Sequence, residues 1–184
     1  LLSSLNDING LELIRYTTSH PIDFTDDLIE AYTKLDKLER YLHLPVQSGS
    51  NNVLKKMKRE YTVEHYKDVV RKFKNLNPDI NLSTDIIVGF CSESDQDFED
   101  TMNLLEEVQY GQIFSFKYSP RKGTRAERHF EDDVPEVVKK GRLKRLQDRQ
   151  LQIQHSINKE LIGKTLQAYV EQKGEKKLEN SIGF

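Results

Sequence analysis

The chain has 184 residues, of which 36% are hydrophobic and 32% charged, and its formal net charge at pH 7 is -2. This length suffices for one sizeable core, and no apolar run approaches the roughly 20 residues that a membrane span requires. Cys91 is the only cysteine, so an internal disulfide is excluded, and one thiol cannot hold a structural zinc ion or an iron–sulfur cluster. We therefore expect a soluble, cytoplasmic protein. Because the sequence begins with Leu, we also expect a fragment of a longer chain.

Helical and strand-like patterns alternate over the first two thirds of the sequence. Apolar residues at helical spacing predict helices near residues 1–8, 25–35, 53–57, 62–73 and 98–108. Buried strands are predicted over residues 11–16, 41–46, 80–88 and 113–118. This alternation predicts an α/β fold with parallel strands and right-handed crossovers. Four strands cannot close an eight-stranded barrel, so the pattern indicates the later strands of a partial parallel (β/α) barrel.

The pattern changes after Arg128. Pro135 introduces a long helix whose narrow apolar seam is formed by Leu143, Leu146, Gln150, Ile153 and Ile157. Gly163 ends this helix, and residues 165–171 alternate like a strand. We therefore predict one domain over residues 1–162 and the start of a small β-module over 163–184.

Charge is unevenly distributed along the chain. Residues 135–164 contain eight Lys or Arg and only three acids (Glu136, Asp148 and Glu160), whereas residues 93–107 are strongly acidic. The basic stretch is either a surface that faces phosphate groups or an ordinary solvated helix face, and charge alone favours the second interpretation.

Polar clusters follow the predicted strands, at the edge where barrels of this kind bind ligands. The clusters are TTSHP at 17–21, QSGS at 47–50, the polar residues of STDIIVGFCSE at 83–93, and the basic turn SPRKGTRA at 119–126. Hydroxyls, Gln47 and Asp85 suit hydrogen bonding to a polar cofactor, while Arg121, Lys122 and Arg125 suit phosphate. Ordinary turn and capping chemistry is the competing interpretation for each cluster.

Several common catalytic motifs are missing from the sequence. The five histidines do not occur at metal-ligand spacing, so we predict no metal site. There is also no Walker loop, no GxGxxG and no GxSxG elbow.

Taken together, these segments resemble the radical S-adenosylmethionine (radical SAM) methylthiotransferases, and within them the MiaB type that modifies tRNA. The segment RYTTSHP at 15–21 resembles the family's R-[FY]-T-T-S-H-P, and LHLPVQSGS at 42–50 matches its motif throughout. Residues 85–93 resemble D-x-I-V-G-F-P-G-E, and YSPRKGT at 118–124 resembles Y-S-x-R-x-G-T. The resemblance extends from about Leu1 to Glu171. One departure is Cys91-Ser92, which replaces the family's Pro-Gly.

The resemblance implies a chemistry and a set of partners. Three cysteines of a CxxxCxxC loop, absent here, hold a [4Fe-4S] cluster that cleaves S-adenosylmethionine to a radical, and a second [4Fe-4S] cluster delivers sulfur. A methylthio group is added to a hypermodified adenosine beside the tRNA anticodon, with external sulfur and electron donors. The predicted β-module would be the start of a TRAM domain, which binds RNA.

The resemblance also assigns roles to residues. Thr18, Ser19, Gln47, Ser83 and Asp85 are expected to line the S-adenosylmethionine pocket, and Arg121, Lys122 and Arg125 are expected to face the anticodon stem-loop. Without the cluster cysteines, we expect no catalytic residue and no activity in this chain alone. Two alternatives stay open: a sister enzyme that acts on threonylcarbamoyladenosine tRNA or a ribosomal protein, and a non-catalytic RNA-binding fragment.

Overall fold

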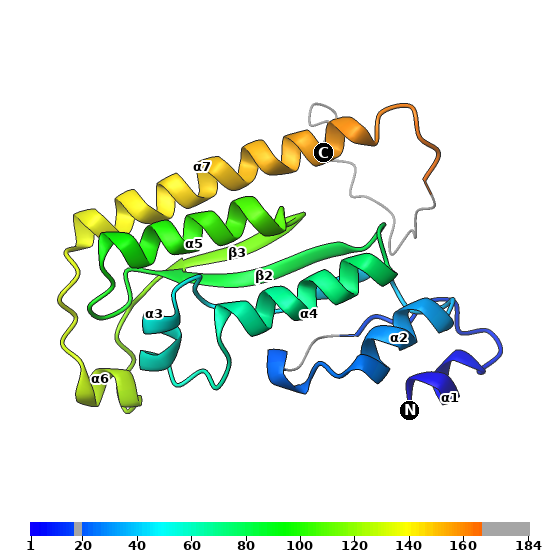
Figure 1. Ribbon diagram of the computed structural model, residues 1–184, viewed down its shortest axis with the longest axis horizontal. Helices are drawn as coiled ribbons and strands as arrows, with labels where there is room; N and C mark the ends of the chain where they lie inside the picture. The colour runs from blue at the N-terminus through cyan, green and yellow to red at the C-terminus, as the bar shows by residue number, and fades with distance from the viewer. Residues whose placement is uncertain (17–19, 167–184) are drawn as a thin grey trace, which may run out of the picture.

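The computed structural model describes residues 1–16 and 20–166 (Figure 1). In chain order the elements are α1 (Leu2–Asn6), the 3-10 helix η1 (Pro21–Asp23), α2 (Asp26–Lys34), β1 (Tyr41–His43), α3 (Asn51–Lys56), α4 (Val63–Leu76), β2 (Asn81–Val88), α5 (Asp95–Val108), β3 (Gln112–Lys117), α6 (Arg125–His129) and α7 (Glu136–Glu160). The five predicted helices of the first part and the long helix after Pro135 are therefore confirmed.

The sheet has the order β1-β2-β3, and both pairs of strands are parallel. This arrangement confirms the predicted α/β fold with a partial parallel sheet. Helices α4 and α5 follow β1 and β2 as crossovers, and α7 runs beside α5 and β3 (Figure 1).

Two predicted strands differ from the structure. Residues 11–16 form only an isolated bridge between Ile14 and Leu38, because their partner in the described chain is the short segment 37–39. The predicted strand 41–46 ends at His43. Pro45 has no N–H for the ladder, and pairing resumes only at Gln47, whose N–H donates to the Asp85 carbonyl over 2.8 Å.

Alternation along β2 separates the two faces of the sheet. Leu82, Ile86 and Val88 are buried in the main core beneath the helices. Asp85 and Ile87 point to the opposite face, since successive strand residues alternate. Their register partners on β3, Phe114 and Phe116, share that face and are 41% and 53% exposed. One face of the sheet thus supports the core, and the other remains open to a ligand.

A second, smaller cluster lies at the carboxyl end of the sheet. Its buried members are Val53 of α3 with Phe90 and Cys91 of the turn after β2. Ala126 of α6 and Phe130, which follows it, pack against this cluster. Helices α3 and α6 are thereby attached to the same end of the molecule.

The long helix α7 packs through the predicted seam. Leu146, Gln150 and Ile153 are buried, and Leu143 and Ile157 pack against the core. The predicted β-module over 163–184 lies almost wholly outside the described residues. Within the described residues, no helix combines the length and the apolar character needed to cross a membrane.

Candidate functional site

The open face of the sheet and the loops beyond it enclose a cavity of about 430 Å³. The lining combines polar and apolar side chains: Gln47, Asp85, Ile87, Phe116, Tyr118 and Arg121. Asp85, Ile87 and Phe116 come from β2 and β3, while Gln47 and Arg121 come from the polar segments that follow the strands. The cavity therefore lies at the carboxyl edge of the parallel sheet, where sheets of this class bind their ligands.

Asp85 belongs to a small polar cluster on the sheet. The Nδ1 atom of His43 lies 2.8 Å from Oγ of Ser83, and Nε2 of His43 lies 3.5 Å from Oδ2 of Asp85. If Ser83 donates its proton to Nδ1, the remaining imidazole proton sits on Nε2, on the side of Asp85. Ser83 is fully buried, so its hydroxyl contacts the His43 ring and reaches Asp85 only through that ring. His43 also packs edge-on against Phe114, with ring centroids 5.6 Å apart.

The loop that carries Gln47 is held firmly against α5. The Gly49 N–H donates to Oγ1 of Thr101 over 2.9 Å, and the Ser50 hydroxyl donates to the Asp97 carboxylate over 2.5 Å. Burial alone would raise the pKa of Asp97, but the hydrogen bonds from Ser50 and Ser94 outweigh it and lower the pKa. Gln47 itself has a φ of 73°, a left-handed conformation uncommon for a residue with a side chain.

The turn after β2 is tied to α7 through the carboxylate of Glu93. The Gly89 N–H donates to the Glu93 carboxylate over 2.6 Å, and Arg142 of α7 contacts the same carboxylate at 2.7 Å. Burial raises the pKa of Glu93, against the lowering effect of these two partners. Cys91 is buried in the second cluster. Ser92 adopts a φ of 57°, which glycine adopts more readily, and its N–H and hydroxyl donate to the Asp133 carboxylate.

The structure places only some of the predicted site residues in the lining of the cavity. Gln47, Asp85 and Arg121 line one cavity, so the structure brings together predicted cofactor and RNA residues. Ser83 lies beneath the cavity, and Lys122 and Arg125 lie exposed just beyond it. Thr18 and Ser19 lie outside the described residues.

Sequence reasoning missed the apolar part of the lining. The polar segments after the strands point to Gln47, Asp85 and Arg121, but not to Phe116 and Ile87, which lie inside the predicted strands, or to His43 beside Asp85. The alternation of residues along two adjacent strands was the available signal, since it places Ile87 and Phe116 on the same face as Asp85.

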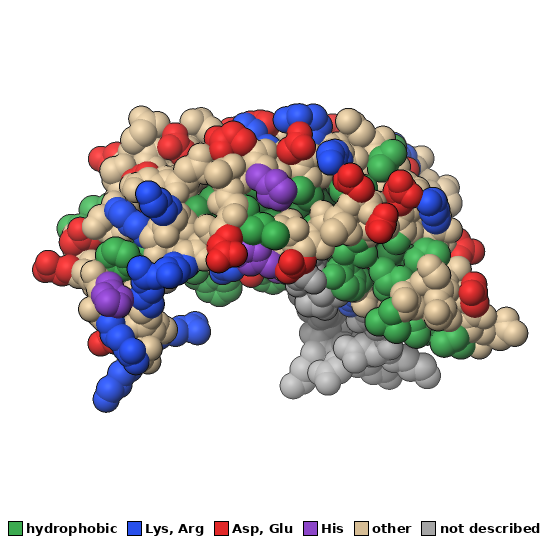
Figure 2. All heavy atoms as spheres, turned by 60° about the horizontal axis from the view of Figure 1, so that its bottom comes forward, with side chains coloured by type: hydrophobic (Ala, Val, Ile, Leu, Met, Phe, Trp, Pro, Cys, Tyr) green, Lys and Arg blue, Asp and Glu red, His purple; other side chains and the backbone are tan. Residues whose placement is uncertain are grey.

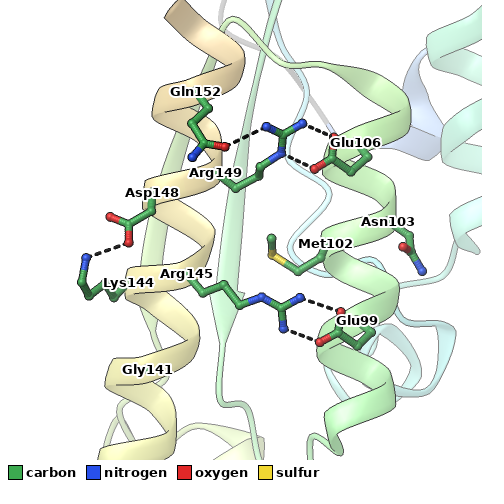
Figure 3. A pocket seen from close by; sticks show the side chains of 10 residues that line it. All are labelled: Glu99, Met102, Asn103, Glu106, Gly141, Lys144, Arg145, Asp148, Arg149 and Gln152. Carbon is green, nitrogen blue, oxygen red and sulfur yellow. Dashed lines mark hydrogen bonds and ion pairs between the residues drawn. The ribbon is translucent and has the colours of Figure 1, made fainter.

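A second groove, between α5 and α7, shows what the basic stretch of α7 contacts (Figure 3). Arg145 forms an ion pair with Glu99, and Arg149 forms one with Glu106. Arg145 and Arg149 thus pair with the acidic stretch of α5, while Lys140 and Lys144 of the same helix are largely exposed.

Comparison with known proteins places this chain in a family. The family model described as the radical SAM superfamily matches residues 3–105, which include the Gln47 loop and β2. The chain belongs to the radical SAM superfamily. Proteins of this superfamily use S-adenosylmethionine together with iron–sulfur chemistry.

Within the superfamily, the chain is similar to proteins named tRNA-2-methylthio-N(6)-dimethylallyladenosine synthase. It is 53% identical over 171 residues to the one from Clostridium botulinum, covering 93% of this chain and 38% of that protein. It is 48% identical to the one from Hahella chejuensis, covering 90% and 37% of the two chains. It is 47% identical to the one from Rickettsia akari, covering 95% and 39%. The chain thus spans well under half the length of these curated relatives.

A solved structure supports the radical SAM fold. Coproporphyrinogen III oxidase (HemN) from Escherichia coli, described as a radical SAM enzyme, superposes with a TM-score of 0.61 at 18% identity. The match covers 78% of this chain and 32% of that enzyme.

The superfamily uses S-adenosylmethionine and an iron–sulfur cluster, and only the first fits the residues of this chain. The cavity offers hydrogen-bonding groups at Gln47 and Asp85 beside the exposed ring of Phe116, which suits a nucleoside-containing cofactor. A cluster does not fit: the sequence has one cysteine, and the described residues contain no group of three His, Cys, Asp or Glu side chains that could hold a metal.

Proposed function

We propose that this chain is the cofactor-pocket and RNA-facing part of a tRNA methylthiotransferase, which adds a methylthio group to a dimethylallyladenosine beside the anticodon. The observation that carries the proposal is the single cavity in which Gln47 and Asp85 meet Arg121. A site of this composition can hold a cofactor and admit a phosphate-bearing substrate from the same side. The names of the relatives supply the substrate class.

Five residues of the cavity have roles that their chemistry supports. Asp85, oriented by His43, accepts hydrogen bonds from hydroxyl or amino groups of the cofactor, and the Gln47 amide both donates and accepts. The ring of Phe116 and the aliphatic side chain of Ile87 cover the apolar surface of an adenine ring. Arg121 neutralises a phosphate at the mouth of the cavity.

S-adenosylmethionine supplies the methyl group and the radical chemistry when it is bound, and the protein positions it. Two [4Fe-4S] clusters, a sulfur donor and an electron donor belong to the whole enzyme in this proposal, and their protein ligands lie elsewhere than in this chain. Lys122 and Arg125 extend the cationic surface toward the anticodon stem-loop. The proposal places the protein in the cytoplasm, where its single buried thiol stays reduced. The start of a TRAM module after residue 163 remains part of this proposal.

Mass spectrometry of tRNA nucleosides tests the proposal. The gene that encodes this chain is expressed in full in a bacterium that lacks its own methylthiotransferase, and the 2-methylthio-dimethylallyladenosine in digested tRNA is quantified. We expect the nucleoside to appear with the wild-type gene and to fall at least tenfold with Asp85→Asn. Asp79→Asn, an exposed residue in the turn before β2, is the matched control and should keep full activity. Absence of the nucleoside with the wild-type gene would overturn the proposal.

A further inference from the structure

Of the 25 Lys and Arg in the described part of the chain, 12 form ion pairs with acids of the chain itself. On α7, Arg142 pairs with Glu93, and Lys144 with Asp148. Other helices follow the same pattern, for example Arg71 with Asp68 on α4. Such cations are poorly placed to bind a polyanion, since each would first have to leave its carboxylate.

Two segments are rich in Lys and Arg side chains that form no such ion pair. Residues 55–59 (KKMKR), at the end of α3, and residues 121–128 (RKGTRAER), leading through α6, carry eight Lys or Arg. Lys56 donates to the Ser92 carbonyl over 3.2 Å. None of the eight forms an ion pair with a described residue: Lys55, Lys56, Lys58, Arg59, Arg121, Lys122, Arg125 and Arg128.

The acids near these segments offset only part of this charge, as with Asp133, whose pKa is lowered mainly by hydrogen bonds from Ser92 and also by the nearby Lys56 cation. Asp132 pairs with Lys139, and Asp133 accepts hydrogen bonds from the N–H and hydroxyl of Ser92 at 2.6 and 2.9 Å. Within the two segments and the residues that adjoin them, only Glu60, Glu127 and Glu131 remain. Cations are therefore in clear excess.

The two segments lie at one end of the molecule. Met57, at the end of α3, and Ala126, on α6, both pack against the cluster of Val53, Phe90 and Cys91. Figure 2 shows Lys and Arg side chains gathered on the projecting part of the molecule that carries α6. Arg121, which begins the second segment, lines the cavity. The second segment thus borders the candidate site, and the first packs on the same cluster beside it.

The backbone conformation of Lys58 is a second indication that residues 55–59 have a functional role. It adopts a φ of 58°, a left-handed conformation that Gly or Asn adopts more readily than Lys. The tight turn is closed by the Arg59 N–H, which donates to the Leu54 carbonyl over 2.9 Å. A cation thus occupies a position for which the backbone favours a smaller, uncharged residue, and such strain commonly accompanies function.

We propose that residues 55–59 and 121–128 form one RNA-binding surface, here called the α3–α6 surface, which contacts RNA phosphates beside the cavity. The inference rests on the proposed function, and it extends RNA contact from the Arg121 loop to α3 while excluding the paired cations of α7. RNA is the fitting partner because its phosphates are regularly spaced and demand cations that are not already neutralised. Contacts of this kind fix the register of an RNA and do not read its sequence.

The salt dependence of RNA binding tests the proposal. The probes are an RNA hairpin with the stem and loop of an anticodon arm and, as competitor, poly-glutamate; affinity is measured by fluorescence anisotropy on the full protein from 50 to 300 mM KCl. The variants are Lys58→Asn, which suits the left-handed turn, Arg59→Gln and Arg125→Gln. Arg71→Gln, an exposed cation on α4, is the matched control, and thermal melting verifies that each variant is folded.

We expect the slope of log affinity against log salt to fall by about 0.7–0.9 for each phosphate contact removed. Lys58→Asn and Arg59→Gln should each show this fall, and Arg71→Gln should not. If Lys58→Asn and Arg59→Gln bind RNA as tightly as the wild type while Arg125→Gln binds more weakly, the α3–α6 surface is overturned and the proposed function stays intact. Equal competition by poly-glutamate and by the hairpin would also overturn it, in favour of an acidic protein partner.

Discussion

Arg142 of α7 places its Nη1 atom 2.7 Å from Oε2 of Glu93, at the end of the turn that follows β2. The side chain of Glu93 is fully buried, and that of Arg142 is 7% exposed. The same carboxylate accepts the Gly89 N–H, while its second oxygen, Oε1, has no partner in the described chain. This buried pair joins the long helix to the edge of the sheet where the cavity lies.

Arg142→Met should destabilise the protein by about 3–5 kcal/mol, because a buried carboxylate loses its counter-charge. Urea unfolding followed by circular dichroism measures the change. Lys140→Met, on the same helix but exposed, should change the free energy of unfolding by less than about 0.5 kcal/mol. Equal stability of the two variants would contradict the importance of the Arg142–Glu93 pair.

Gly49→Ala should disrupt the Gln47 loop. A Cβ atom at Gly49 would lie 2.5 Å from Cα of Thr101 and 2.6 Å from the Asp100 carbonyl oxygen, and both are backbone atoms that cannot easily move. Gly141→Ala on α7 is the matched control, since its Cβ would meet no atom within 4 Å. In a helix this change should stabilise by about 0.5–1 kcal/mol. We expect Gly49→Ala to lower the melting temperature and Gly141→Ala to raise it. An unchanged melting temperature in Gly49→Ala would show that the loop is not packed as described.

The ion pairs between α5 and α7 should make stability depend on pH. Hydrogen bonds from Arg145 and Arg149 lower the pKa of Glu99 and Glu106 below their ordinary value of 4.5. A lowered folded-state pKa means that this stabilisation is fully present above about pH 4.5 and is lost as pH falls through the folded pKa.

The double variant Arg145→Gln/Arg149→Gln should therefore melt below the wild type at pH 7. The difference should shrink as the pH falls below 4.5 and through the lowered folded-state pKa of the two carboxylates. A difference that does not change with pH would assign the effect to lost packing of the arginine side chains.

Ser83 should fix the tautomer of His43. In the wild type we expect the neutral imidazole to carry its proton on Nε2, because the Ser83 hydroxyl lies 2.8 Å from Nδ1 and can donate to it. The ¹⁵N chemical shifts of the His43 ring report the tautomer directly. Ser83→Ala should move the population toward the Nδ1–H form.

Thr84→Val is the comparison for this prediction, because Oγ1 of Thr84 bonds to backbone groups of Val46 and Leu44 and not to His43. It should lower stability and leave the His43 tautomer unchanged. The same tautomer in Ser83→Ala as in the wild type would rule out the proposed donation.

The sequence was sufficient to predict the order of helices and strands, because their apolar periodicities are long and clear. It was insufficient for residues 11–16, whose apolar run resembles a strand but meets only residues 37–39. A strand requires a long enough partner, and the sequence does not state which partner is available. Pro45 did signal the early end of β1, through its missing N–H.

The candidate site was only partly predictable for a similar reason. Gln47, Asp85 and Arg121 stand in polar segments that follow strands, and the topology brings such segments together. The pairing of Arg145 with Glu99 depends on how α7 packs against α5, so charge counts along the chain could not reveal it. Likewise, a hydroxyl at Ser83 suggests a ligand contact, while packing buries it beneath His43.

The most direct test of the central claim is the mapping of S-adenosylmethionine binding on this chain by NMR. Amide shift changes on titration with S-adenosylmethionine should concentrate at Gln47, Asp85, Ile87 and Phe116, and Asp85→Ala should weaken the binding at least fivefold. Shift changes confined to the groove between α5 and α7, or binding that is unaffected by Asp85→Ala, would contradict the assignment of the cavity as the cofactor pocket.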